Sequence, residues 1–169
     1  MTSYISKTEI TLDKYIEMSS NPLGKKARND LKRWKTAKIS GTVIMAVIGA
    51  IHAFSGRTEL AVICAVLGLA LLYQLLIQRK KLLKKRYKTT TDSMTDSKWI
   101  RTITFDDKIT VADGNNSSVF AYSDYKWADE NDKYYLLYRN ENVVLRIEKG
   151  SFTYGNEKDF LRWINNKMK

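Results

Sequence analysis

Two apolar runs, Ile39 to Gly56 and Leu60 to Ile77, dominate the hydrophobic pattern of the chain and lie three residues apart. The second run carries no formal charge, and neither does the first as far as Phe54. A helix needs roughly 20 apolar residues to cross a bilayer core about 30 Å thick. Both runs are slightly shorter, but flanking Lys and Arg side chains can extend their charged ends to the interface. The pattern therefore predicts a hairpin of two transmembrane helices, at about 39–56 and 60–77.

Basic residues are concentrated at the two outer ends of this hairpin. Residues 25–38 and 79–88 hold 14 of the 29 Lys and Arg residues, whereas Arg57 is the only basic residue of the intervening loop. Positive charge gathers on the cytoplasmic side of a membrane protein, so we expect both termini in the cytoplasm and a multi-pass location, with two spans, in the cell membrane. No apolar core precedes Ile39, which predicts that the first span is an uncleaved anchor.

The same flanks explain the net charge of +11, because they contain only one acid, Asp30, and the rest of the chain sums to −2. Each Lys or Arg beside an anionic bilayer is worth about 1 kcal/mol. We therefore expect anionic membrane lipids as partners and do not expect nucleic acid. A solvated basic linker helix at 25–38 is the alternative for the first flank. The predicted lipid-headgroup contacts are Trp34, Lys35, Lys38, Arg79, Lys80 and Lys81.

Small residues recur at helical spacing in both spans, which lets two helix backbones approach closely. We expect these faces to pack the spans against each other, and a homo-oligomer through the same faces is the alternative. His52 lies within a turn of the outer end of its span and is interpreted as an interfacial residue. The small residues are Ala46, Gly49, Ala50 and Ala53 in the first span and Ala61, Ala65 and Gly68 in the second.

The N-terminal segment, 1–24, alternates like a strand from Tyr4 to Thr11 and then has apolar residues at helical spacing from Leu12 to Ile16. Within the hairpin segment, 25–88, one helix is expected to run from Leu60 to Lys88, about 44 Å in length, and so to extend beyond the second span as a stalk. A polar connector is expected at 89–93.

Residues 89–169 are rich in aromatic side chains and contain six short β-type runs between polar turns. A helix capped by Asn156, with Phe160, Trp163, Ile164 and Met168 on its apolar face, closes the chain. The pattern predicts an α+β membrane protein in which a small antiparallel β domain is closed by a C-terminal helix. The β-type runs are Trp99–Phe105, Lys108–Ala112, Ser118–Tyr122, Tyr125–Ala128, Lys133–Arg139 and Val143–Glu148.

Residues that could carry catalysis are scarce. The segments outside the spans have no His and no Cys, which excludes Ser-His-Asp and Cys-His nucleophiles and the usual zinc ligand sets. The acidic clusters at 106–107 and 129–132 fall between β-type runs and are interpreted as turns. We therefore expect no enzyme activity, no cofactor and no metal site.

Four runs in the C-terminal part carry a family resemblance, namely Tyr122–Tyr125, Asp129–Tyr138, Val144–Phe152 and Asp159–Ile164. They resemble the C-terminal domain of YcxB-like bacterial membrane proteins. The resemblance implies a short N-terminal segment, two spans and a cytoplasmic domain similar to pleckstrin-homology (PH) folds, with Tyr4 to Thr11 as an added strand of its sheet. Two positions depart from the family, since Glu148 replaces a common proline and Tyr125 a common aliphatic residue.

The predicted function is that of a non-catalytic membrane protein presenting a cytoplasmic, PH-like, protein-binding module. Two alternatives remain open: a self-immunity protein against a bacteriocin or similar toxin, and an accessory subunit of a larger membrane complex. Basic and acidic residues nearly balance after Trp99, which favours a protein partner over a polyanionic ligand. The candidate binding surface consists of Lys126, Trp127, Tyr134 and Tyr138.

Overall fold

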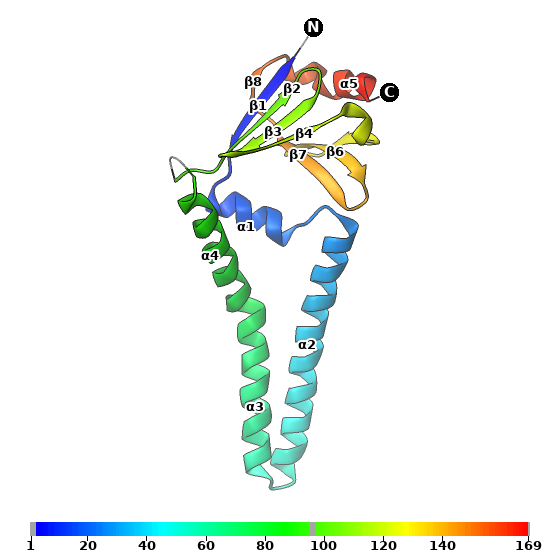
Figure 1. Cartoon of the computed structure of the whole chain (residues 1–169). Helices are drawn as coiled ribbons and strands as arrows, with labels where there is room; N and C mark the ends of the chain where they lie inside the picture. The colour runs from blue at the N-terminus through cyan, green and yellow to red at the C-terminus, as the bar shows by residue number, and fades with distance from the viewer. Residues whose placement is uncertain (1–2, 95–96, 169) are drawn as a thin grey trace. The chain divides into compact units, whose positions relative to one another are not determined.

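The computed structural model describes residues 3–94 and 97–168, so residues 1–2, 95–96 and 169 of the predicted segments lie outside the described part. The chain divides into two compact units. The hairpin unit comprises residues 27–86, and the β unit comprises residues 1–26 together with 87–169. The ribbon in Figure 1 follows the chain through both.

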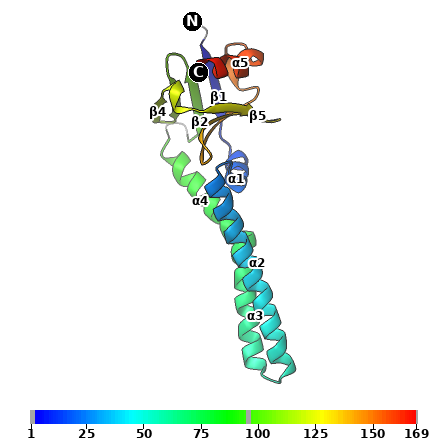
Figure 2. The ribbon, with the colours of Figure 1, turned by 90° about the vertical axis from the view of Figure 1, so that its right-hand side faces the viewer.

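The hairpin unit is built from two long helices joined by a short loop (Figure 2). Helix α2 covers Lys25–Phe54. The second helix runs continuously from Thr58 to Asp92 and consists of α3 (Thr58–Tyr73), the π-helix η1 (Gln74–Gln78) and α4 (Arg79–Asp92). Both are long and apolar enough to cross a membrane, as the hydrophobic pattern predicts.

The end of the second long helix differs from the prediction. Residues 89–92, expected to form a polar connector, are still helical. The Thr91 hydroxyl, which is buried, lies 3.1 Å from the carbonyl oxygen of Tyr87 and 3.0 Å from that of Lys88. A hydroxyl that bonds back to the preceding turn destabilises a helix only slightly, so the run of threonines does not end it.

The two helices of the hairpin unit meet along a stripe that contains only some of the predicted small residues. A Cβ atom at Gly49 would lie 3.2 Å from Cβ of Cys64, and one at Gly68 would lie 3.6 Å from Cβ of Met45. Gly41, which was not predicted, approaches Leu71 in the same way, at 3.1 Å. The prediction was wrong for four alanines, whose side chains are exposed because they face away from the partner helix: Ala46, Ala50, Ala53 and Ala65.

The β unit contains two antiparallel sheets. The five-stranded sheet has the order β4-β3-β2-β1-β8, and its strands are β1 (Tyr4–Glu9), β2 (Ile100–Phe105), β3 (Ile109–Asp113), β4 (Asn116–Phe120) and β8 (Phe152–Tyr154). The three-stranded sheet has the order β5-β6-β7, with β5 (Trp127–Glu130), β6 (Tyr134–Asn140) and β7 (Val143–Glu148). The N-terminal strand is thus an inner strand, paired with β2 and β8.

Three helical segments complete the β unit: α1 (Leu12–Ser20), the short 3-10 helix η2 (Tyr122–Asp124) and α5 (Glu157–Lys167). Asn156 caps α5, as predicted, by accepting a hydrogen bond from the backbone N–H of Lys158. The predicted strand at 118–122 is wrong at its end, because Tyr122 starts η2 and donates its hydroxyl proton to the carbonyl oxygen of Asp106.

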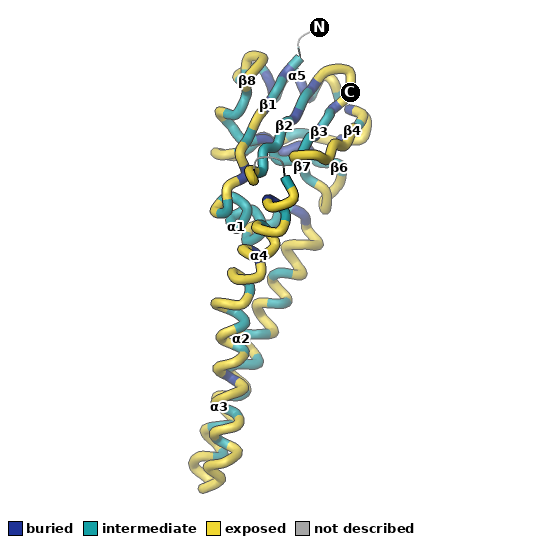
Figure 3. Tube along the Cα trace, turned by 60° about the vertical axis from the view of Figure 1, so that its left-hand side comes forward, coloured by how far each residue is buried: buried dark blue, intermediate teal, exposed yellow. Residues whose placement is uncertain are grey.

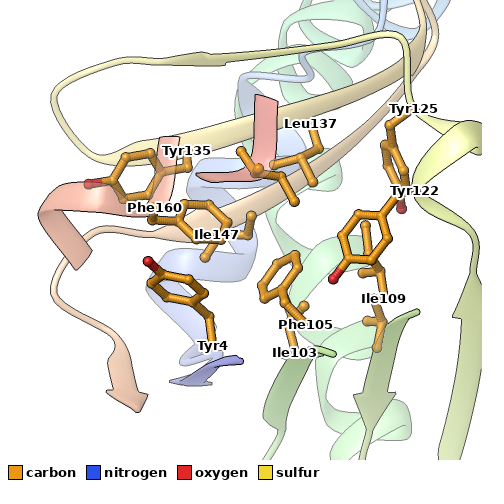
Figure 4. Close-up of a cluster of buried hydrophobic side chains, with 12 residues drawn as sticks. Tyr4, Ile103, Phe105, Ile109, Tyr122, Tyr125, Tyr135, Leu137, Ile147 and Phe160 are labelled. Carbon is orange, nitrogen blue, oxygen red and sulfur yellow. The ribbon is translucent and has the colours of Figure 1, made fainter. Parts of the chain in front are cut away.

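The core of the β unit lies between the two sheets and α5, and aromatic side chains fill most of it (Figure 4). Tyr4 from β1, Phe105 from β2 and Phe160 from α5 are almost fully buried. The Tyr4 ring lies edge-on to Phe160, with 5.3 Å between ring centroids, and 4.7 Å from Trp163. Large aromatic rings supply much buried area in a unit of this size.

Ion pairs and a hydrogen bond connect helix α1 to the three-stranded sheet. The Lys14 ammonium lies 2.7 Å from Glu148 on β7, and the Glu17 carboxylate lies 2.7 Å from the ammonium of Lys133, which precedes β6. Arg146 donates a hydrogen bond of 2.8 Å to the carbonyl oxygen of Asn21, at the end of the helix. The N-terminal segment therefore belongs to the β unit through both its strand and its helix.

Candidate functional site

Three of the six predicted lipid-contact residues of the hairpin unit lie where α2 faces the second long helix around Gln74 and Arg79. The Arg79 guanidinium lies 5.4 Å from the centre of the Trp34 ring, a cation–π distance. The Lys38 ammonium donates a hydrogen bond to the side-chain oxygen of Gln74 on the π-helix. Three of the six predicted residues, Trp34, Lys38 and Arg79, are thus brought together.

The other three predicted lipid-contact residues are exposed on the outer surface of the hairpin unit. Lys35 and Lys80 are exposed, and the Lys81 ammonium lies 3.2 Å from the hydroxyl of Tyr73. None of these three lines a cavity with Trp34 and Arg79.

A cavity of about 360 Å³ opens beside Trp34 and Arg79. The sequence prediction missed three polar members of its wall, Gln74, Gln78 and Arg86. Gln78 follows Gln74 by four residues and precedes Arg86 by eight. Residues at these intervals lie on one face of a helix, so the spacing indicated a shared surface. The π-helix that begins at Gln74 and ends at Gln78 could not have been predicted from the hydrophobic pattern. We call this cavity the flank cavity, and its lining residues are Trp34, Gln74, Gln78, Arg79, Leu82, Leu83 and Arg86.

In the β unit, three of the four predicted surface residues form one patch, which we call the Trp127 patch: Lys126, Trp127 and Tyr138. The rings of Trp127 and Tyr138 stack with 4.7 Å between centroids and an angle of 10°. These residues face each other in the register of β5 and β6, and the backbone N–H of Lys126 donates to the carbonyl oxygen of Tyr138. Trp127 remains 41% exposed. Because β5 is an edge strand, the stacked pair lies beside unpaired backbone groups.

Tyr134, the fourth predicted residue, lies apart from this patch. It begins β6 and contacts Arg146, whose guanidinium carbon is 6.0 Å from the ring centre. Both line a cavity of about 310 Å³ together with Glu17 and Lys133. Burial lowers the pKa of the Arg146 guanidinium, but that pKa starts so high that the group stays charged. The mixture of acidic and basic groups in this wall favours no single class of ligand.

The titratable groups of the β unit have structural roles. Burial raises the pKa of Tyr122 and that of Tyr125 to about 12, so both phenols stay neutral even in alkaline solution. Within residues 3–94 and 97–168 no group of three or more His, Cys, Asp or Glu side chains could hold a metal ion. The surfaces described above present aromatic, amide and guanidinium groups, which are groups that can bind a ligand.

Comparisons with known proteins add no family to this description. No family model matches the chain, and neither the curated proteins nor the solved structures contain a match.

Proposed function

We propose that the chain is a two-span membrane protein that holds the β unit at the cytoplasmic face and binds a protein partner through the Trp127 patch. The proposal includes a PH-like, YcxB-like character for the β unit. Its two antiparallel sheets closed by a C-terminal helix support that assignment, together with the four runs that resemble the family.

The membrane part of the proposal rests on the exposed apolar surface of the hairpin unit. Figure 3 shows exposed positions along most of α2 and α3. Phe54, Leu69 and Leu76 are 94%, 66% and 68% exposed. Burying one such side chain is worth about 1.5–3 kcal/mol, and soluble monomers rarely expose a contiguous apolar patch of this extent. A bilayer covers that surface, and the basic flanks fit the headgroup regions at its cytoplasmic side.

The protein-binding part rests on the Trp127 patch. Trp and Tyr are enriched among the residues that dominate binding energies, because they bury a large area at little cost in side-chain entropy. β5 pairs with a strand on one side only, and an extended segment of a partner can add to an edge strand of this kind. The near balance of charge in residues 99–169 argues against a polyanionic ligand.

Site-specific photocrosslinking in intact cells tests the protein-binding part. A benzophenone amino acid at Lys126 is expected to form a discrete adduct that Trp127→Ala reduces strongly. Tyr154→Ala, which removes a comparably exposed ring from β8, serves as the matched control and is expected to leave the adduct unchanged. An adduct insensitive to Trp127→Ala, or no adduct at all, contradicts the proposal.

The self-immunity and complex-subunit interpretations stay predictions, since no described residue favours either. The self-immunity interpretation is tested by expressing the chain in a toxin-sensitive strain and measuring whether that strain survives the toxin. The complex-subunit interpretation is tested by the mass of the adduct that forms at Lys126.

A further inference from the structure

The flank cavity combines the groups that bind a phosphate diester. Arg79 and Arg86 contribute guanidinium groups, which can hold a phosphate through paired hydrogen bonds. Gln74 and Gln78 add carboxamide groups, and Trp34 adds an indole N–H. No residue of this wall is acidic, which favours an anion over a cation or a zwitterion. A volume of about 360 Å³ lies at the lower end of the range for small-molecule sites.

The backbone holds the amide groups of this wall in place. The π-helix at Gln74–Gln78 widens one turn of an otherwise α-helical segment. Such insertions are frequent at functional sites, and they displace side chains from the regular helical face. The hydrogen bond from Lys38 fixes the carboxamide of Gln74 by its oxygen. Its amide nitrogen is therefore the end that can donate to a ligand.

The position of the cavity along the helices selects the kind of phosphate. The second apolar run ends at Ile77, and the wall begins within that last apolar turn and continues to Arg86. Trp34 lies five residues before the first run, at the depth where aromatic side chains meet headgroups. Leu82 and Leu83 give the wall an apolar component as well. A ligand with a charged head and an apolar tail fits this combination of a cationic wall and adjoining apolar surface better than a fully soluble phosphate does.

We propose that the flank cavity binds the headgroup of one anionic phospholipid of the cytoplasmic leaflet. The phosphate lies between Arg79 and Arg86, the amides of Gln74 and Gln78 contact its ester or glycerol oxygens, and the acyl chains follow the exposed apolar surface of α3. The site goes beyond general attraction by the basic flanks, because it assigns one bound lipid to a defined set of residues. It rests on the proposed membrane location of the hairpin.

Native mass spectrometry of the full chain in detergent micelles measures this binding. The probes are phosphatidylglycerol and phosphatidylcholine with the same acyl chains, and glycerol 3-phosphate as a soluble source of the same phosphate. We expect the first phosphatidylglycerol to bind about tenfold more tightly than phosphatidylcholine. No preference between the two lipids, or equally tight binding of glycerol 3-phosphate, overturns the assignment.

Matched variants separate a defined site from delocalised attraction. R79Q/R86Q removes two charges from the wall, and K84Q/K88Q removes two exposed charges of the same helix that do not line the cavity. We expect the first variant to lose the preference for phosphatidylglycerol and the second to keep it. Equal losses overturn the proposal, because general attraction predicts them. If R79Q/R86Q does not fold, R79K/R86K keeps both charges without the paired geometry and is expected to weaken the preference severalfold, and an unchanged preference again overturns it.

Flotation with vesicles of phosphatidylcholine and phosphatidylglycerol distinguishes this inference from the proposed function. A chain that does not float contradicts the membrane location itself. A chain that floats but shows no lipid preference contradicts only the headgroup site.

Discussion

Replacing Gly155 by alanine tests the packing that ties the N-terminal strand to the rest of the β unit. Gly155 has a φ of +91°, and a Cβ atom there would lie 2.4 Å from Cδ1 and 2.8 Å from Cε1 of the Tyr4 ring. Tyr4 is 2% exposed and packed among Phe152, Phe160 and Trp163, so its ring has little room to move away.

Gly150 provides the matched control, because it also has a positive φ, +78°, but nothing lies within 4 Å of a Cβ atom placed there. Both substitutions carry the backbone cost of about 1–2 kcal/mol for an L residue at positive φ. Only Gly155→Ala adds overpacking, which costs about 1–3 kcal/mol. We therefore expect the free energy of unfolding to fall by about 1–3 kcal/mol more for Gly155→Ala than for Gly150→Ala. In a unit of about 100 residues this difference lowers the melting temperature by roughly 5–20 °C more.

Thermal unfolding of the full chain in detergent, followed by near-ultraviolet circular dichroism, measures the difference. Trp163 lies 4.7 Å from Tyr4, so its signal reports on the packing around that ring. Equal melting temperatures for the two variants would refute the packing of β8 against Tyr4 and, with it, the inner position of β1.

Three further predictions concern other contacts. Burial raises the pKa of Asp113, but hydrogen bonds from Arg101 and Trp99 and the Arg101 charge outweigh it and leave the pKa below its usual range. A lowered pKa in the folded state means that the stabilisation is present above the unfolded value, near 4, and is lost as pH falls below it. Asp113→Asn is therefore expected to cost about 1–3 kcal/mol at pH 7 and less at pH 3, measured by urea unfolding. Glu141→Gln breaks a pair with Lys25 in which both side chains are more than half exposed, so it is expected to leave the melting temperature unchanged at either pH. In the hairpin unit, Gly49→Val is expected to separate the helices at Cys64 and to speed maleimide labelling of that thiol, whereas Ala50→Val, on an exposed face, is expected to leave the labelling rate unchanged.

The elements that follow from a single strong pattern could be predicted from the sequence. Two uncharged apolar runs gave the long helices, and alternation with polar turns gave most strands of the two antiparallel sheets. The C-terminal helix followed from Asn156 and the apolar spacing of Phe160 and Ile164. Strand β8 was missed because three residues are too few to show an alternation.

The remaining features depend on contacts between distant residues. Small residues occur on several faces of the first span, so the sequence alone does not tell which face packs, and Gly41 and Met45 contact the partner helix where Ala46 was expected. The π-helix is a backbone feature without a residue signature, and its first and last residues, Gln74 and Gln78, both line the flank cavity. Tyr134 and Tyr138 share one face of β6, but only the structure places Tyr134 beside Arg146 and apart from Trp127.

Cysteine accessibility tests the central claim, a two-span hairpin with the β unit in the cytoplasm, most directly. The chain has one cysteine, Cys64, so a Cys64→Ala background accepts a single new thiol in the hairpin loop, by Ser55→Cys, or in β4, by Ser117→Cys. A membrane-impermeant maleimide applied to intact cells is predicted to label the loop thiol at once and the β4 thiol only after lysis. Labelling of the β4 thiol in intact cells, or release of the chain from membranes by alkaline carbonate, would contradict the account.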